Sequence, residues 1–301
     1  MLQRRTDLAV EARELWTQSA GEKSALAGVQ AEERKREGYP VTVVKVLNEE
    51  GAQALGKPVG TYVTLELSGL KRREEDAFPR AVRALAAELR ALLSVPKGAP
   101  VLVVGLGNRA ITPDNIGPGA ADHTLVTRHL VEQVPEHFGH FRPVSALAAG
   151  VLATTGVESS ELVQAVVEQI KPACVIAVDA LASRSLARVC STVQLADTGI
   201  TPGSGVGNHR AALNRESLGV PVIALGVPTV VDVATLCADV LAEAGRGELE
   251  PQALAGAGAG LMVTPRDIDQ SVADLAKVIG YGINLALQDG LSVEDVEMFL
   301  S

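Results

Sequence analysis

Short apolar runs alternate with amphipathic helical patterns over the last two thirds of the chain. Five runs without polar alternation predict buried strands, at Val101–Val104, Val144–Leu147, Cys174–Val178, Thr192–Leu195 and Val222–Leu225. Apolar residues recur at helical spacing near 119–133, 158–170, 229–243, 266–287 and 292–300. Apolar strands separated by helices are typical of a mainly parallel sheet covered on both faces. The pattern therefore predicts an α/β fold, with a mainly parallel sheet flanked by helices.

The first hundred residues follow a different pattern. The first forty are highly charged, and we expect them to form a helical arm that ends in the mixed-sign run Glu32–Glu37. β-branched residues predict short strands at Val41–Leu47 and Thr61–Leu67, and Phe78–Leu93 has the apolar spacing of a helix. We therefore expect a small strand and helix subregion, at about residues 8–97, within one α/β domain that spans 8–301.

Composition narrows the possible functions of this 301-residue chain. A hydrophobic share of 47% and a charged share of 21% are typical of a folded protein. A formal charge of −9 and an aromatic share of 3% disfavour direct nucleic-acid binding. The sequence has no membrane-length apolar run and no signal-like start, so we expect a cytosolic protein without a membrane partner. Three cysteines without a Cys-x-x-Cys pair indicate neither a disulfide framework nor a zinc cage.

A glycine-rich turn follows the first predicted strand of the sheet. Gly105-Leu-Gly107-Asn-Arg-Ala110 fits the dinucleotide fingerprint G-x-G-x-x-G/A. A dinucleotide site also needs a helix that starts at the turn and an acidic residue at the end of the next strand. Pro113 interrupts the helix, and the strand near Val144 ends in Ala148-Ala-Gly150. Binding of a nucleotide or phosphate at the Gly105 loop therefore remains only an alternative.

Carboxylates at the ends of predicted strands are the stronger chemical signal. Asp114 lies in the loop after the first strand of the sheet, Asp179 ends Cys174–Val178, and Asp197 follows the strand at Thr192. If these strands are parallel, their carboxyl ends meet at one crevice. Two carboxyl groups held close together have different pKa values, so one can act as a base on water and the other as an acid. The alternative is that each aspartate caps a helix or turn.

Other reaction chemistries have weaker support. His123 with Asp114 provides a possible ligand set for a metallopeptidase, although no His-Glu-x-x-His motif is present. Ser204 and Cys190 are candidate nucleophiles, but the glycine-rich segment around Ser204 is better suited to bringing backbone N–H groups to a ligand. Asp197-Thr-Gly199 matches the pepsin tripeptide, which belongs to a β-rich fold and recurs by chance. Nothing in the sequence indicates a cofactor.

Long ordered motifs are spread over nearly the whole chain, at Arg5–Ala12, Tyr62–Glu66, Leu102–Asn108, Thr112–Asp114, Leu125–Leu130, Phe141–Ser145, Ala177–Leu181, Pro202–Asn208, Gly226–Asp232 and Leu261–Pro265. Together they resemble the germination proteases of spore-forming bacteria. The resemblance implies an endopeptidase, made as a zymogen, that degrades the small acid-soluble proteins of the spore. It also implies a fold similar to hydrogenase-maturation peptidases, a homotetramer, and a location in the forespore or spore core.

The same resemblance implies site residues. The two proposed catalytic aspartates of the family fall on Asp114 and Asp179, the pair that the strand ends indicate, and an aspartic or a metallopeptidase mechanism stays open. Thr6–Glu11 resembles the family's cleavage sequence, so the expected self-cleavage lies between Asp7 and Leu8 and makes residues 1–7 a propeptide. The alternative is that Asp7 is the N-cap of a helix.

We also predict which residues bind substrate and where this chain differs from its family. Arg184, Asp197 and Ser204 are the candidates for substrate binding, with Arg184 as the reader of the acidic residue before the cut, because a guanidinium suits a carboxylate. The resemblance marks two departures, a shorter propeptide than in some relatives and a short Ala/Gly-rich connector between Leu241 and Leu261.

Overall fold

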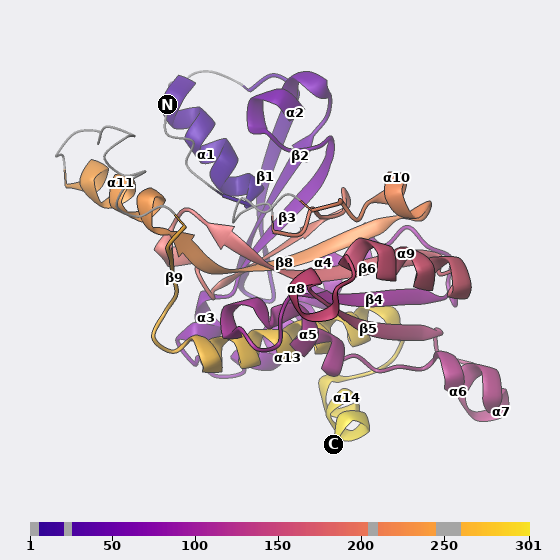
Figure 1. Ribbon diagram of the computed structural model, residues 1–301. Coiled ribbons are helices and arrows are strands. Elements are labelled where there is room, and N and C mark those ends of the chain that lie inside the picture. The colour runs from indigo at the N-terminus through magenta and orange to yellow at the C-terminus, as the bar shows by residue number, and fades with distance from the viewer. Residues whose placement is uncertain (1–5, 21–25, 204–209, 245–259) are drawn as a thin grey trace.

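The computed structural model describes residues 6–20, 26–203, 210–244 and 260–301. Within these residues the strands form one nine-stranded sheet, in the order β1-β2-β3-β7-β8-β6-β4-β5 with β9 on β8 (Figure 1). The strands are β1 (Val29–Arg36), β2 (Tyr39–Val46), β3 (Gly60–Glu66), β4 (Val101–Leu106), β5 (Val144–Gly150), β6 (Cys174–Ser183), β7 (Thr192–Ala196), β8 (Val222–Asp232) and β9 (Met262–Val263).

The sheet has a parallel part and an antiparallel part. Strands β5, β4, β6 and β8 are parallel neighbours, as the alternation of apolar runs and helices predicts. Strands β1, β2, β3 and β7 continue the sheet from β8 in antiparallel pairs. The predicted α/β class is confirmed, and the N-terminal strands extend the same sheet.

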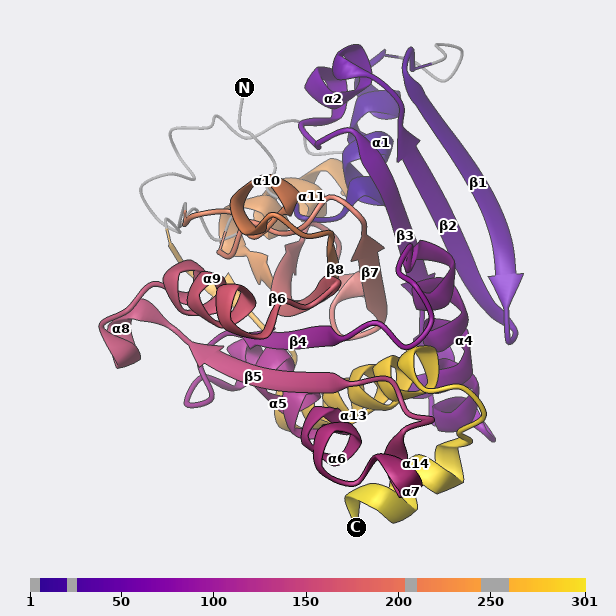
Figure 2. The ribbon, with the colours of Figure 1, turned by 90° about the vertical axis from the view of Figure 1, so that its right-hand side faces the viewer.

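Helices cover both faces of the sheet (Figure 2). One face packs against α4 (Ala77–Leu92), α5 (Ile116–Asp122) and α13 (Ile268–Leu287). On the other face, α9 (Ser159–Ile170) covers the parallel strands, while α1 (Ala9–Ala20) and α2 (Glu49–Leu55) cover the antiparallel ones. The remaining helices are α3 (Ser68–Lys71), α6 (Arg128–Gln133), α7 (Pro135–Phe138), α8 (Leu152–Thr155), α10 (Arg215–Leu218), α11 (Val233–Glu243) and α14 (Val293–Leu300), with 3₁₀ turns at Thr112–Asp114 and Leu186–Arg188. None of the described helices is long and apolar enough to cross a membrane.

The predicted helical arm is helical only over its first part. Strand β1 replaces the expected helix at Glu32–Glu37 and pairs with β2 through a tight turn, in which Glu37 and Gly38 have φ values of 50° and 84°. Positive φ at both turn residues matches the twist of a two-residue hairpin. The charged run was misassigned because an edge strand can leave charged side chains in solvent on both sides, so it lacks the apolar alternation of a buried strand.

One buried carboxylate binds two charged side chains of β1. Glu88 of α4 is fully buried, and its carboxylate accepts hydrogen bonds from Arg34 at 2.5 Å and from Arg36 at 2.9 Å. Removing both guanidinium groups with the double substitution Arg34→Ala and Arg36→Ala leaves a buried charge without these partners. We expect a loss of about 3 kcal/mol in the free energy of unfolding. Urea titration measures this loss. Glu88→Gln keeps the volume of the side chain and removes its charge, so it should lower the free energy of unfolding much less. Equal losses in the two variants would contradict the argument.

Three further segments differ from the sequence prediction. Strands β6 and β8 run several residues beyond the predicted Val178 and Leu225. The predicted helix at 119–133 is divided into α5 and α6, because the buried Asn284 side chain binds the backbone between them. Its amide nitrogen donates to His123 O at 2.8 Å, and its amide oxygen accepts from Leu125 N at 2.8 Å. Such a break depends on a distant residue and leaves no local sequence signal.

Strand β7 runs antiparallel to its neighbours β3 and β8. Its carboxyl end, which precedes Asp197, therefore lies at the edge of the sheet where β4, β6 and β8 begin, opposite the edge formed by their carboxyl ends. The expectation that Asp114, Asp179 and Asp197 share one crevice is thus wrong for Asp197. Local sequence sets strand propensity but does not set strand direction, which follows from how the chain connects.

Candidate active site

A cavity of about 390 Å³ opens at the carboxyl ends of the parallel strands, where ligand sites of α/β folds usually lie. Strand β4 ends at Leu106, whereas β6 continues to Ser183, and this difference in length exposes part of β6 to the cavity. The cavity is lined by Asp114 and Asp179, and also by Asp7 and Arg210. The structure thus brings together the two aspartates that the sequence predicted.

Asp114 ends the 3₁₀ turn that follows β4. Its Oδ2 accepts a hydrogen bond from Asn108 N at 2.7 Å, which holds the carboxylate across the loop. Gly107 has a φ of 115°, and a Cβ there would lie 2.1 Å from Asp114 O, so only glycine fits this position. Partial burial raises the pKa of Asp114, against the effects of the Asn108 hydrogen bond and the nearby positive charge of Arg210.

Asp179 lies on β6, one residue beyond the last pair with β4. It is only 5% exposed, and its Oδ1 accepts a hydrogen bond from Ala180 N at 2.9 Å. Burial, followed by the negative charge of Asp114, raises the pKa of Asp179 to about 8. At neutral pH Asp179 therefore keeps its proton. Asp179 is thus protonated, and its neighbour Asp114 is closer to solvent. Such a pair of carboxyl groups is suited to acid and base catalysis.

Gly105 in β4 and Gly117 in α5 allow close packing of the backbone. A Cβ on Gly105 would lie 2.2 Å from Gly117 O, and a Cβ on Gly117 would lie 2.2 Å from Leu106 O and 2.4 Å from Val178 O. The first turn of α5 is therefore packed directly against the ends of β4 and β6. This packing accounts for Gly105, and the close approach of Asp114 O accounts for Gly107, so neither glycine needs a nucleotide to explain it.

Asp7 lies at the cavity, and the chain leads from it directly into α1. Asp7 N donates to Ala182 O at 2.9 Å, and Ala182 N donates to Asp7 Oδ2 at 2.9 Å. Both the backbone and the carboxylate of Asp7 are thus bound by the part of β6 that extends beyond the end of β4. Leu8 is fully buried, and its N–H donates to Thr6 Oγ1 at 3.0 Å. The carboxylate of Asp7 is therefore bound by β6, in place of the N-cap role considered from the sequence.

Two side chains from distant segments donate to the carbonyl oxygen of Asp7. Lys57 Nζ lies 2.9 Å from this oxygen, and Gln194 Nε2 lies 3.1 Å from it. Gln194 Oε1 also accepts a hydrogen bond from Ala9 N at 2.7 Å. The peptide bond between Asp7 and Leu8 is consequently held by polar contacts on both sides.

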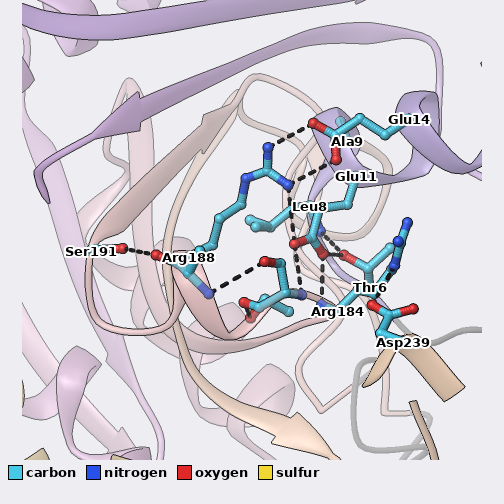
Figure 3. Close-up of polar contacts among 12 residues, drawn as sticks. Thr6, Leu8, Ala9, Glu11, Glu14, Arg184, Arg188, Ser191 and Asp239 are labelled. Atoms are coloured by element: carbon cyan, nitrogen blue, oxygen red, sulfur yellow. Dashed lines mark hydrogen bonds and ion pairs between the residues drawn. The ribbon is translucent and has the colours of Figure 1, made fainter. Parts of the chain in front are cut away.

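A second polar cluster surrounds Glu11 in the first turn of α1 (Figure 3). The fully buried Glu11 carboxylate accepts from Thr6 Oγ1 at 2.5 Å, Arg184 N at 2.7 Å, Ser185 N at 3.1 Å and Arg188 at 3.3 Å. Arg188 also binds Glu14 through both of its terminal nitrogens. These contacts fix the start of α1, and with it the position of Asp7.

Of the three predicted substrate-binding residues, Arg184 and Asp197 do not line the cavity. The Arg184 guanidinium pairs with Asp239 at 2.7 Å and lines a separate pocket beside Glu11, so Arg184 is not placed to read Asp7 (Figure 3). Asp197 Oδ1 accepts from Thr61 N at 2.7 Å at the other edge of the sheet. Ser204 lies outside the described residues, as does most of the glycine-rich segment around it and of the Ala/Gly connector.

Side chains proposed for the other chemistries lie elsewhere. The ring of His123 packs toward Tyr281, with 6.2 Å between ring centroids, whereas Asp114 faces the cavity. Cys190 is buried, and burial raises its pKa to about 11, so it is a poor nucleophile. Among the described residues, no group of three His, Cys, Asp or Glu side chains is arranged to hold a metal ion.

Sequence reasoning missed Ala182, Lys57, Gln194 and Arg210. Ala182 acts through backbone groups, so its side chain carries no signal. Lys57 and Gln194 are 50 and 187 positions from Asp7, and only the fold brings them near it. Arg210 follows the glycine-rich segment, and a cation there would have been detectable as a charged residue beside a predicted ligand loop.

The peptidase A25 family model, described as germination protease, matches residues 9–247 and 240–300. A solved structure of a NiFe hydrogenase maturation protease, HycI from Thermococcus kodakarensis KOD1, aligns with a TM-score of 0.37 at 19% identity, over 65% of this chain and 98% of that chain.

Curated relatives match almost end to end. Germination protease from Caldanaerobacter subterraneus subsp. tengcongensis is 44% identical, over 98% of both chains. The proteins of the same name from Clostridium perfringens and Bacillus licheniformis are 43% and 37% identical, over 99% and 98% of this chain and 99% and 96% of their own. The chain belongs to the germination protease family and is therefore a peptidase.

Proposed function

We propose that this protein is an endopeptidase made as a zymogen, which cuts its own chain between Asp7 and Leu8 and then cleaves spore proteins after acidic residues. The observation that supports the proposal most directly is the position of Asp7. It lines the same cavity as Asp114 and Asp179, and its carbonyl oxygen and its neighbours are held by hydrogen bonds. In our proposal, the two carboxyl groups that line this cavity act on the peptide bond that follows Asp7.

The two aspartates take different roles in this proposal. Asp114, the more exposed of the pair, is the base that removes a proton from a water molecule as its oxygen adds to the carbonyl carbon of Asp7. Asp179, which holds its proton at neutral pH, is the acid that gives a proton to the nitrogen of Leu8 as the C–N bond breaks. The products are a carboxyl group at Asp7 and an amine at Leu8, so atoms and protons balance.

Selection of an acidic residue before the cut follows from the contacts of Asp7. Its carboxylate accepts the Ala182 N–H, and its negative charge acts to raise the pKa of Lys57, which burial lowers. A charge-assisted hydrogen bond to a carboxylate is roughly twice as strong as a neutral one. An apolar residue at this position would leave the Ala182 N–H without an acceptor, and Asn or Gln would offer only an uncharged one, so cleavage after Asp or Glu is favoured.

Cleavage also changes the stability of the segment that follows it. The cut creates an ammonium group at Leu8, which is fully buried in the uncut chain. A buried charge without a partner costs several kcal/mol, so the new N-terminus should leave its site. Departure of residues 8–11 would open the half of the site beyond the cut to another polypeptide, which is how trimming activates the enzyme in our proposal.

The substrates we propose are the small acid-soluble proteins of the spore. The family name links the enzyme to germination, and Thr6–Glu11 resembles the cleavage sequence of those proteins. By the same resemblance we expect a homotetramer located in the forespore and spore core.

Intact-mass spectrometry tests the proposal directly. Purified protein is held at mildly acidic and at neutral pH, and its mass is followed over time. We expect loss of residues 1–7, and the trimmed protein should then cut a peptide that contains the sequence of residues 6–11. An unchanged mass, together with an intact peptide after addition of trimmed protein, would contradict the proposal. Inhibition by a chelator would move the mechanism from the aspartate pair to a metallopeptidase.

The rate of cleavage should fall at high pH. Asp179 acts as the acid only while it is protonated, and its pKa is raised to about 8. The rate is therefore expected to hold through neutral pH and to fall about tenfold per pH unit above about pH 8. At low pH the rate should fall again as Asp114 becomes protonated. Initial rates on the peptide between pH 4 and 10 check this, and a flat profile above pH 8 would exclude Asp179 as the acid.

A further inference from the structure

The environment of the Asp7 carbonyl oxygen suggests a role beyond docking. Lys57 follows the C-terminal end of α2, and Gln194 lies in the middle of β7. Donors from these two distant segments converge on one oxygen, at 2.9 and 3.1 Å. During hydrolysis this oxygen takes up the negative charge that develops when water adds to the carbonyl carbon. Both donors are therefore placed where charge develops in the reaction.

The amide of Gln194 is held in one orientation by the chain it contacts. Its oxygen accepts from Ala9 N at 2.7 Å, while its nitrogen donates to Asp7 O at 3.1 Å. Gln194 is only 8% exposed, so water competes little for either contact. The amide thus spans the bond to be cut, and these two hydrogen bonds, one on each side of it, are both to backbone atoms. This mode of binding is independent of side chains and suits any polypeptide in the site.

We propose that Lys57 and Gln194 form the oxyanion-binding pair of this peptidase, stabilising the negative charge on the carbonyl oxygen of the residue before the cut. The inference rests on the proposed cleavage between Asp7 and Leu8 and adds the groups that stabilise its intermediate. Water adds to the carbonyl carbon, the carbonyl oxygen becomes an anion held by Lys57 Nζ and Gln194 Nε2, and the C=O bond re-forms as the C–N bond breaks. Neither side chain gains or loses a proton.

The pair also links acidic specificity to catalysis. Burial lowers the pKa of Lys57, whereas the carboxylates of Asp7 and Glu11 act in the opposite direction. An acidic residue before the cut therefore favours the ammonium form of Lys57, which stabilises an oxyanion better than a neutral amine. A substrate with a neutral residue at that position would lose this support along with its contact to Ala182.

Substitution of Lys57 tests the inference. Loss of one oxyanion donor typically slows a reaction about 10²- to 10³-fold, so Lys57→Met should slow removal of residues 1–7 by that factor. Lys57→Arg, which keeps a charged donor, should recover part of the rate. Lys45→Met is the matched control, because Lys45 is an exposed lysine on β2, and it should be trimmed at the wild-type rate. Intact-mass spectrometry gives the rates for all four proteins.

A second measurement separates catalysis from simple anchoring of the N-terminal segment. Hydrogen exchange reports whether the Ala9 N–H, which is bound by Gln194, is still protected in Lys57→Met. Slow trimming with this protection retained supports the oxyanion role. A wild-type rate, or slow trimming with the protection lost, overturns it. If the wild-type protein is neither trimmed nor able to cut the peptide after trimming, the proposed cleavage itself fails, which is a distinct result.

Discussion

Asp179→Asn is expected to abolish removal of residues 1–7 and at the same time to make the folded protein more stable. The amide has the shape of the protonated carboxyl group but cannot give a proton to the leaving nitrogen. The loss of rate should reach about 10³-fold or more, because the acid of the pair is removed entirely. Intact mass over time measures the rate, and normal trimming of this variant would exclude Asp179 from the mechanism.

The gain in stability follows from the pKa of Asp179. The ordinary pKa of an aspartate side chain is 3.8, and in the folded protein the pKa of Asp179 is raised to about 8. Between these values the folded state holds a proton that the unfolded state has released, so stability is full below about pH 4 and declines as pH rises towards 8. At pH 7 the difference is on the order of a few kcal/mol, since one pKa unit corresponds to about 1.4 kcal/mol. Asp179→Asn removes this loss of stability, because asparagine does not ionise.

Thermal unfolding at several pH values checks the second effect. The melting temperature of Asp179→Asn should exceed that of the wild type at pH 8 and approach it at pH 4. Asp289→Asn is a suitable control, because Asp289 is exposed and its pKa is lowered by Lys97, so its substitution should not stabilise the protein at pH 8. Equal melting temperatures of Asp179→Asn and wild type at pH 8 would show that burial does not hold the proton on Asp179.

Gly117→Ala is expected to cause a large loss of stability. An added Cβ would lie 2.2 Å from Leu106 O and 2.4 Å from Val178 O, and both are backbone atoms where the pairing of β4 with β6 ends. The first turn of α5 would have to move away from β4 and β6, at a cost of about 3 kcal/mol. Because Asp114 precedes this turn and Asp179 follows Val178, the same shift should separate the pair and lower the rate of cleavage.

Gly56→Ala provides a control for glycine replacement in general. Gly56 ends α2 with a φ of 62°, and nothing lies within 4 Å of an added Cβ. Only the left-handed conformation opposes alanine there, at about 1 kcal/mol. Urea unfolding should therefore rank Gly117→Ala well below Gly56→Ala in stability. A similar loss in the two variants would mean that the backbone at α5 adapts more readily than the structure indicates.

The parallel half of the fold was predictable because its strands are buried on both faces. Apolar runs such as Val101–Val104 and Cys174–Val178 leave little choice of structure, and helices at the predicted spacing cover them. The charged strand β1 was not predictable in this way. It is an edge strand whose pairing with β2 is set by the hairpin turn, and two of its arginines are satisfied by Glu88 on a helix about 50 residues away.

The candidate site was also predictable only in part. Asp114 and Asp179 follow predicted strands, so the sequence alone indicated that they meet, and the structure places both at one cavity. Asp197 follows a predicted strand as well, but the direction of β7 sends it to the other edge. A local sequence pattern does not indicate the direction of a strand, so it could not separate Asp197 from Asp114 and Asp179.

The sequence by itself determined the fold class, the family resemblance and the pair of aspartates, because burial, periodicity and motif order are local properties of the chain. Tertiary structure alone decided that Ala182 binds the Asp7 carboxylate and that Lys57 and Gln194 meet at its carbonyl oxygen. These contacts join segments far apart in sequence and in part use backbone groups that every residue carries. Their positions follow from the packing of α1 against the sheet, which no single segment encodes.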